Sequence, residues 1–200
     1  MSRQPISHAL RLLKQQKLVE ENGRRGLTVS GIDAVRILEL YQVRTALDAL
    51  AARLAAERIA GRVIDMQQRR AAQRALSSGL ALRPDAPVLE FIQADVAFHT
   101  ALYRLSGNHA IEDTVAAQWP HLKRSMGAVL DDPEQRPLVW AEHQEILRLV
   151  LAGDAAGAER AARRHTNRAG GETARRLSQS SFSIGGNRDA ARGAAASAVR

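Results

Sequence analysis

Hydrophobic residues recur every three or four positions through most of the chain, which is the period of an amphipathic α-helix. The longest run covers residues 32–60, where apolar residues alternate at spacings of three and four: Leu40, Val43, Leu47, Leu50 and Leu54. The same period predicts further helices over residues 63–77, 88–105, 111–130, 133–152 and 155–176. We therefore expect an all-α fold, a helical bundle of about six helices with short connections.

Residues that stop or start helices separate these segments. Glycine and asparagine end helices, whereas aspartate caps the first turn and proline is tolerated within it. Such residues stand at every expected boundary: Gly61, Pro84, Pro87, Ser106-Gly107-Asn108, Asp132-Pro133 and Gly153-Asp154.

The two ends of the chain differ from this body. Residues 1–30 predict a short helix, with Ile6, Leu10 and Leu13 at helical spacing, and then two short strands over 18–20 and 27–29. Residues 177–200 are rich in Ser, Gly and Ala and have no sustained apolar period, which predicts a disordered tail. The expected organisation is thus a segment 1–30, a helical domain 31–176 and a tail 177–200.

Composition excludes several classes of protein. The chain has no cysteine, which excludes a disulfide scaffold, a thiolate metal site and a cysteine nucleophile. No apolar run approaches the ~18–20 residues that cross a bilayer, and the N-terminus has no apolar signal region. We therefore expect a cytoplasmic protein without a membrane partner.

Positive charge gathers at the N-terminus. The net charge is +8, and residues 1–30 carry six Lys or Arg against two Glu, a net of +4. A basic end on a nearly neutral body indicates a segment that binds a polyanion. On charge alone, a solvated basic face explains the pattern equally well.

Four polar residues fall on faces that the apolar pattern turns inward. Asp95 and His99 lie four residues apart among the apolar positions of helix 88–105. His143 falls within the apolar stripe of helix 133–152, and His165 lies on the small-residue face of the last helix. Since a buried carboxylate is costly unless it is paired or coordinated, the four residues predict a metal site in the bundle core.

The donor set restricts the metal. One carboxylate and three imidazoles suit a divalent ion, zinc, nickel or manganese above all and also iron, and leave a position open for a ligand atom. A buried Asp–His hydrogen-bond network is the alternative. The remaining histidines are not expected to ligate, because His8 and His121 lie off the apolar faces and His109 falls in a loop.

Several segments, in the family's order, resemble the FadR branch of the GntR-family transcriptional regulators. Residues 2–13, 17–20 and 22–29 are similar to the end of a winged helix-turn-helix. Residues 40–48 resemble the opening of that branch's effector domain, the FCD domain. Three segments resemble the central signature of that domain: Asp95-Val96-Ala97-Phe98-His99, Leu102-Tyr103 and Ser106-Gly107-Asn108. Two resemble its closing signature: Glu142-His143-Gln144-Glu145-Ile146, and Ala152-Gly153-Asp154 leading to His165.

The resemblance implies a homodimeric regulator, usually a repressor, that binds double-stranded operator DNA. The family's metal ligands match Asp95, His99, His143 and His165, and a small organic-acid (carboxylate) effector binds beside the metal. Arg44 is a candidate to contact that effector, with a solvated surface charge as the alternative. DNA contact is implied for three arginines: Arg3, Arg24 and Arg25.

The N-terminal segment departs from the family pattern. Two further helices normally precede the turn at which this sequence starts, and Ser7 and His8 replace an arginine and a glutamate. A truncated gene product or a misassigned start would explain the first departure. We expect residues 1–30 to be a partial winged helix that binds DNA weakly and without sequence preference, because phosphate contacts carry no sequence information.

Two other functions remain open from the residues alone. A metal held by three histidines and an aspartate could activate water in an enzyme. Glu142, next to His143, points about 100° away around the helix, which makes it a poor general base. The chain could also be a remnant that pairs with a longer regulator and does not bind DNA.

Overall fold

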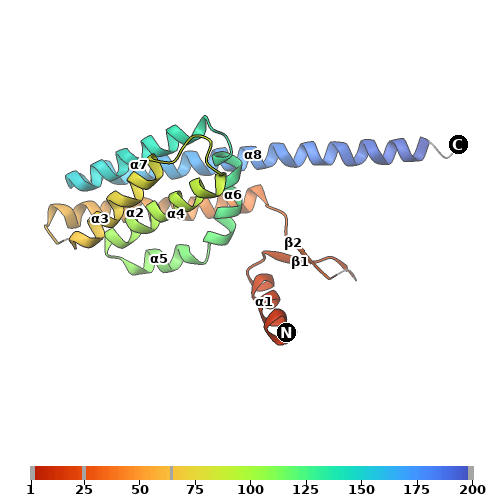
Figure 1. Cartoon of the computed structure of the whole chain (residues 1–200), viewed down its shortest axis with the longest axis horizontal. Coiled ribbons are helices and arrows are strands. Elements are labelled where there is room, and N and C mark those ends of the chain that lie inside the picture. Colours follow the sequence, from red (N-terminus) through yellow and green to blue (C-terminus); the bar gives the residue numbers. More distant parts are fainter. Residues whose placement is uncertain (1–2, 24–25, 64, 198–200) are drawn as a thin grey trace. The chain divides into compact units, whose positions relative to one another are not determined.

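The computed structural model describes residues 3–23, 26–63 and 65–197, with side chains for residues 4–23, 26–63 and 65–179. These residues form eight helices and one two-stranded sheet (Figure 1). They divide into two compact units, residues 1–33 and 34–200. The division lies three residues beyond the boundary that we expected from the sequence.

The first unit has the expected helix and hairpin. Helix α1 (Arg3–Gln15) is followed by strands β1 (Val19–Glu21) and β2 (Leu27–Val29), which pair antiparallel with Val19 opposite Val29. Ile6 and Leu10 are exposed on α1, whereas Leu13, at the end of the same apolar face, is half-buried. Arg24, Arg25 and the side chain of Arg3 lie outside the described residues.

The second unit is a helical bundle, as the apolar period predicts. Its helices in chain order are α2 (Ala34–Ala60), α3 (Met66–Leu80), α4 (Val88–Ser106), α5 (His109–Ala116), α6 (Trp119–Leu130), α7 (Gln135–Ala152) and α8 (Ala155–Ser197). None of the helices within the described part of the chain is both long and apolar enough to cross a membrane.

Small residues let α2 and α8 pack closely along their lengths. Alanines are buried on both helices and belong to one core with residues of α4 and α7: Ala52, Ala55, Ala56, Ala158, Ala161 and Ala162. Alanine side chains allow two helix axes to approach more closely than leucines would. The tight α2–α8 pair therefore forms a base against which α4 and α7 place their larger side chains.

The buried face of α2 is not the leucine seam that the sequence suggests. Leu40 is buried, but Val43 is 48% exposed, and Leu47, Leu50 and Leu54 are only half-buried. The buried positions include Arg44 and Asp48 instead. The alanine side of α2 packs against α8, so Leu47, Leu50 and Leu54 lie at the edge of the α2–α8 contact.

Two expected boundaries differ from the structure. The expected helix 111–130 is two helices in the structure. The helical conformation is interrupted at Ala117 and Gln118, and Pro120 occupies the first turn of α6. The bundle therefore has seven helices among the described residues instead of about six. His109, expected in a loop, is the first residue of α5, and the Asn108 side chain caps that helix by accepting from the Ala110 N–H.

The predicted disordered tail from residue 177 is also at odds with the structure. Helix α8 continues without a break to Ser197 (Figure 1). Once a helix has formed, each added residue contributes one more hydrogen bond, and alanine and arginine have high helix propensity. Leu177 is still buried against the bundle, so the helical domain reaches at least to this residue.

Adjacent glycines in α8 test the close α2–α8 packing. A Cβ on Gly170 would lie 2.5 Å from Tyr41 Cβ, whereas a Cβ on Gly171 would meet nothing within 4 Å. We expect Gly170→Ala to lower the free energy of unfolding by about 1–3 kcal/mol through overpacking. Gly171→Ala is the matched control and should raise it by about 0.5–1 kcal/mol, since alanine favours the helix. Urea unfolding of both variants is the measurement, and equal effects would contradict the packing described.

Candidate metal centre

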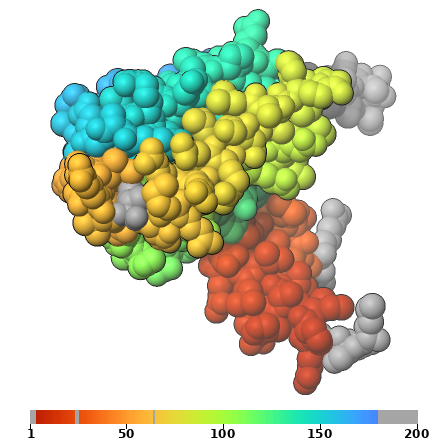
Figure 2. Space-filling model, turned by 60° about the vertical axis from the view of Figure 1, so that its left-hand side comes forward, coloured from red at the N-terminus to blue at the C-terminus, as the bar shows by residue number. Residues whose placement is uncertain are grey.

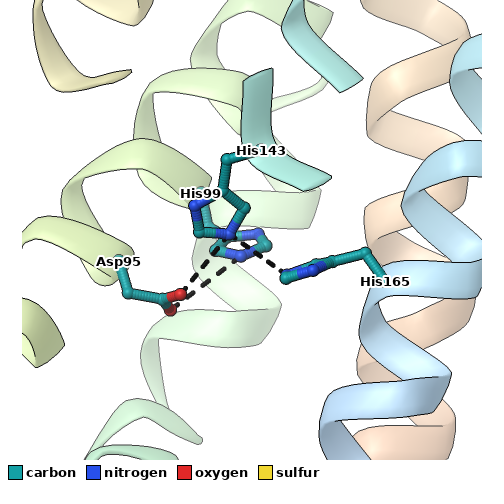
Figure 3. A group of neighbouring side chains, drawn as sticks. All are labelled: Asp95, His99, His143 and His165. Atoms are coloured by element: carbon teal, nitrogen blue, oxygen red, sulfur yellow. Dashed lines mark hydrogen bonds and ion pairs between the residues drawn. The ribbon is translucent and has the colours of Figure 1, made fainter. Parts of the chain in front are cut away.

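The structure brings together the four residues that the sequence singles out. Asp95 and His99 come from consecutive turns of α4, His143 from α7 and His165 from α8, and their side chains point toward one another (Figure 3). One potential ligand atom from each lies within 4.8 Å of the others. All four residues are buried. The inward faces inferred from the apolar period are therefore correct for each of them.

Distances within this group show how closely the atoms converge. His143 Nε2 lies 3.1 Å from His165 Nε2 and 3.4 Å from Asp95 Oδ1. His99 Nε2 lies 3.9 Å from Asp95 Oδ2. Two imidazole nitrogens that both present lone pairs repel each other at such a separation unless a proton or a cation lies between them.

Unsatisfied polar atoms show that the group fits a metal ion. Asp95 Oδ2 and His99 Nε2 are buried without a hydrogen-bond partner in the described structure. Buried polar atoms are normally hydrogen-bonded, so such atoms indicate a missing partner. One carboxylate oxygen and three imidazole nitrogens are a suitable donor set for zinc and neighbouring divalent ions. The residues present can therefore hold such an ion.

Asp48 of α2 stands behind His99, and the sequence analysis missed it. Its Oδ2 lies 3.4 Å from His99 Nδ1 and accepts a hydrogen bond of 2.7 Å from Thr166 Oγ1, while its Oδ1 accepts from the Tyr103 hydroxyl. A carboxylate on the outer nitrogen of a ligating histidine fixes the ring and raises its basicity. The only signal in the sequence is the position of Asp48 four residues after Arg44.

Glu142 of α7 supports His165 in the same way. Its Oε2 lies 2.7 Å from His165 Nδ1, and both of its oxygens accept hydrogen bonds of 2.6 Å from Arg168. Since an ionised carboxylate only accepts, His165 Nδ1 carries the proton and Nε2 presents its lone pair to the group. Glu142 does point away from its own neighbour His143, as expected, but it reaches a histidine on the adjacent helix.

Arg44 is buried in the core, not solvated on the surface. Its guanidinium lies 3.3 Å from Asp48 Oδ2 and 3.7 Å from Asp95 Oδ2, and it packs over the Trp119 ring at 5.1 Å. Burial alone would lower the pKa of Arg44, but Asp48 and the other negative neighbours raise it above its ordinary value. The arginine therefore remains charged and links the two buried aspartates.

The environment favours the protonation states that a metal requires. Burial, together with the charge of Arg44, lowers the pKa of His99. Burial and the neighbouring His165 and His99 lower the pKa of His143 well below its usual range. Burial raises the pKa of Asp48, but His99 and Arg44 outweigh burial and hold that pKa below normal. Ligation needs neutral imidazoles, which the lowered pKa values of His99 and His143 favour. The lowered pKa of Asp48 keeps that carboxylate ionised beside His99 Nδ1.

A small cavity adjoins Asp95 and His165. Arg44, Asp95 and His165 line it together with Tyr41 and apolar residues of α6. Its volume of about 20 Å³ is room for roughly one water molecule. Two of the four metal-site residues, Asp95 and His165, thus share a cavity with Arg44.

The other histidines do not join this group. His8 and His109 are exposed, and His121 is half-buried. Among the described residues, Asp95, His99, His143 and His165 are the one group of three or more such side chains close enough to share a metal ion.

Comparison with known proteins identifies the family of this chain. It matches the model of the FCD domain over residues 39–168. A relative from Streptomyces ambofaciens, an HTH-type transcriptional regulator in an unstable DNA locus, is 34% identical over 170 residues, which cover 82% of this chain and 67% of the relative. The chain belongs to the FCD-domain family. The FCD domain expected from the sequence is thereby confirmed.

Solved structures share the fold at lower identity. A GntR transcriptional regulator from Rhodococcus sp. RHA1 is 20% identical, with a TM-score of 0.71 over 86% of this chain and 80% of that one. The Zn²⁺-bound FCD domain of TM0439 is also 20% identical, with a TM-score of 0.57 over 74% of this chain and 98% of that one. These likenesses establish the all-α FCD fold.

Glu142 offers a test of this geometry in the metal-free protein. Burial raises its pKa, but hydrogen bonds from His165 and Arg168 outweigh burial and lower that pKa to about 2. A carboxyl group with a lowered pKa stabilises the fold above its unfolded pKa and loses this effect as the pH falls toward its folded pKa. In chelator, Glu142→Gln should cost about 1–3 kcal/mol at pH 7, and the difference from wild type should shrink between pH ~5 and ~2.

Glu145 on the same helix is the matched control, because it forms an exposed ion pair with Arg148. Glu145→Gln should leave the free energy of unfolding almost unchanged at every pH, because solvent screens an exposed ion pair. Urea titrations at several pH values measure both variants. A Glu142→Gln effect that does not depend on pH would contradict the ionised Glu142–His165–Arg168 contact.

Proposed function

We propose that this protein is a DNA-binding transcriptional regulator, a repressor, whose helical domain binds a divalent metal and a small organic-acid effector. The convergence of four buried ligand atoms beside a cavity lined by Arg44 carries this proposal. The family assignment supports the regulatory role. We place the protein in the cytoplasm, where it has access to DNA.

Asp95, His99, His143 and His165 would hold the metal, with Asp48 and Glu142 fixing the orientation of two of the histidines. A bound divalent ion supplies a Lewis-acidic centre that attracts anionic oxygens. Zinc, nickel and manganese all suit these donors. That a related domain is described as Zn²⁺-bound supports zinc among them.

The effector would enter on the side of Arg44. Tyr41 and Thr166 line the same cavity, so a carboxylate there meets a guanidinium and hydroxyl groups as well as the metal. The cavity holds roughly one water molecule, so the effector must displace apolar side chains of α6 such as Met126. Movement of α6 is a means by which effector binding could alter the bundle.

DNA contact is proposed for the basic N-terminal unit. Its helix α1 and hairpin β1–β2 correspond to the recognition helix and wing of the resemblance, and Arg3, Arg24 and Arg25 are the proposed contacts. The alternative of a metalloenzyme is less well supported, because Glu142 is engaged by His165 and Arg168 and is not free to act as a base.

Metal analysis is the first test. Protein purified without a histidine tag should contain stoichiometric divalent metal, and His143→Ala should lose it, because three ligands would remain around a buried void. His121→Ala removes a half-buried histidine outside the group and should retain the metal. Elemental analysis of the three proteins measures this. Metal retained by His143→Ala, or absent from wild type after reconstitution, would leave only an Asp–His hydrogen-bond network.

Binding of a fluorescent duplex from the upstream intergenic region tests the regulator itself. We expect that small organic acids change the affinity, and that chelator or Arg44→Gln abolishes their effect. Anisotropy titrations against a scrambled duplex at several salt concentrations separate specific binding from phosphate attraction. An acid effect that persists in chelator would remove the metal from the mechanism.

A homodimer is the third element of the proposal, since a two-fold operator matches a two-fold protein. Val35, Leu38 and Val43 are exposed apolar residues on α2 and offer a contact face. Sedimentation should show a dimer at tens of micromolar, and Val43→Asp should shift it toward monomer. A wild-type monomer at that concentration would contradict the dimer.

A further inference from the structure

A second cavity lies on the bundle away from the four metal-site residues. It is formed by the end of α3, the loop to α4, the start of α4 and the first half of α7, and has a volume of about 370 Å³. Figure 2 shows the side of the bundle where the yellow residues of α3 lie beside the teal residues of α7. Pro84, Phe91, Pro137 and Trp140 give it a largely apolar wall. Its size is within the range of small-molecule sites, roughly 300–1,000 Å³.

Arg136 places a positive charge in this wall. The residue is only 8% exposed, and its guanidinium packs over the Phe91 ring at 4.1 Å. Nε donates to the Leu130 carbonyl at 2.8 Å, and Nη1 donates to the Pro84 carbonyl at 2.6 Å. No carboxylate of the described residues lies within 4.0 Å of it, so this nearly buried cation lacks an anionic partner there.

The third nitrogen of Arg136 is available to a ligand. Nη2 makes no hydrogen bond within the described structure, and it is not among the buried atoms without a partner. Because the residue lines the cavity and is otherwise covered, this nitrogen is reached from the cavity side. The two carbonyl contacts hold the guanidinium in place, so little side-chain freedom would be lost on binding.

Trp140 connects this cavity to the bundle core. It is 4% exposed, and a Cβ on Gly79 would lie within 1.9–2.3 Å of its ring, so the indole tip packs directly on α3. On its other side the indole meets His143 edge-on, with ring centroids 4.9 Å apart. An occupant of the cavity would therefore contact the Trp140 indole, and Trp140 is not one of the metal-site residues.

We propose that this cavity is a second ligand site that binds a small aryl carboxylate. Two aromatic rings and the prolines suit a flat apolar body, and the unpaired Arg136 guanidinium suits a carboxylate at its end. The site is separate from the effector site beside the metal, because none of the four metal-site residues lines it.

Fluorescence of Trp140 tests the proposal in the full chain. The protein has two tryptophans, so Trp119→Phe leaves Trp140 as the single reporter. The probes are 3-phenylpropanoate and its neutral amide, 3-phenylpropanamide, which match in shape and differ in charge. We expect the carboxylate to change the Trp140 emission with an affinity at least about tenfold higher than that of the amide, from one charge-assisted contact.

Three variants in this background locate the binding. Arg136→Gln should reduce the carboxylate affinity to that of the amide, and Ala141→Phe should block both probes by filling the cavity from an exposed position of α7. Ala141→Ser is the matched control and should bind as the parent does. Ala141→Phe leaves the Arg136 hydrogen bonds intact, so the test stands even if Arg136→Gln unfolds.

Asp95→Asn and added chelator distinguish the two sites, and neither should weaken 3-phenylpropanoate binding. Binding lost in Asp95→Asn and retained in Ala141→Phe would place the carboxylate at the metal centre and overturn the proposal. Equal affinities for acid and amide would overturn it too, as would no emission change at about 10 mM probe.

Discussion

A buried carboxylate within an all-helical core is the constraint on which the rest of this bundle depends. Asp95 and Asp48 both lie inside the protein, where an unpaired charge is very unfavourable. Arg44 between them offsets part of this cost, and Tyr103 and Thr166 bind the remaining oxygens of Asp48. Of the two aspartates, Asp95 keeps a buried oxygen that has no hydrogen-bond partner in the described structure. A cation at that point would complete the charge balance of the core.

This charge balance requires several helices to meet at one place. α2 supplies Arg44 and Asp48, α4 supplies Asp95 and His99, and α7 and α8 each supply one histidine. Large side chains between α2 and α8 would separate these helices. The alanine contact between them thus does more than fill the core, because it sets the distance between the polar groups of α2 and those of α8.

Much of this arrangement could be predicted from the sequence. The period of three and four identified the body helices, apart from the break between α5 and α6. It also placed Asp95, His99, His143 and His165 on inward faces, because the period of one helix determines which of its residues share a side. The supporting residues could not be found in this way. Glu142 turns away from the stripe of its own helix and reaches His165 only because α8 lies beside it. From the sequence, Asp48 and Arg44 are polar residues beside a row of leucines that is expected to be buried. In the structure α2 packs on α8 through its alanines, so Arg44 and Asp48 are buried and most of the leucines lie at the edge of the contact.

The missed break at Ala117 and Gln118 has a related cause. A proline in a first helical turn is compatible with a new helix as well as with a kink, and only the packing of α6 on α8 decides between them. The tail beyond residue 176 has no apolar period, yet its backbone continues α8, since local propensity extends a helix without a packing partner.

Two neighbouring residues of α7 have different roles in the site. His143 points into the metal-site group, whereas Glu142 hydrogen-bonds His165 of α8 from outside that group. Arg168, one turn after His165, closes the same contact from α8. The two helices are therefore locked in register by residues one and three positions apart. In evolution these four positions should change together or not at all. If a related protein did not bind the proposed metal, Glu142 and Arg168 would no longer be under selection together with His143 and His165. Joint loss of the four residues would then mark a relative that does not respond to a metal at this place.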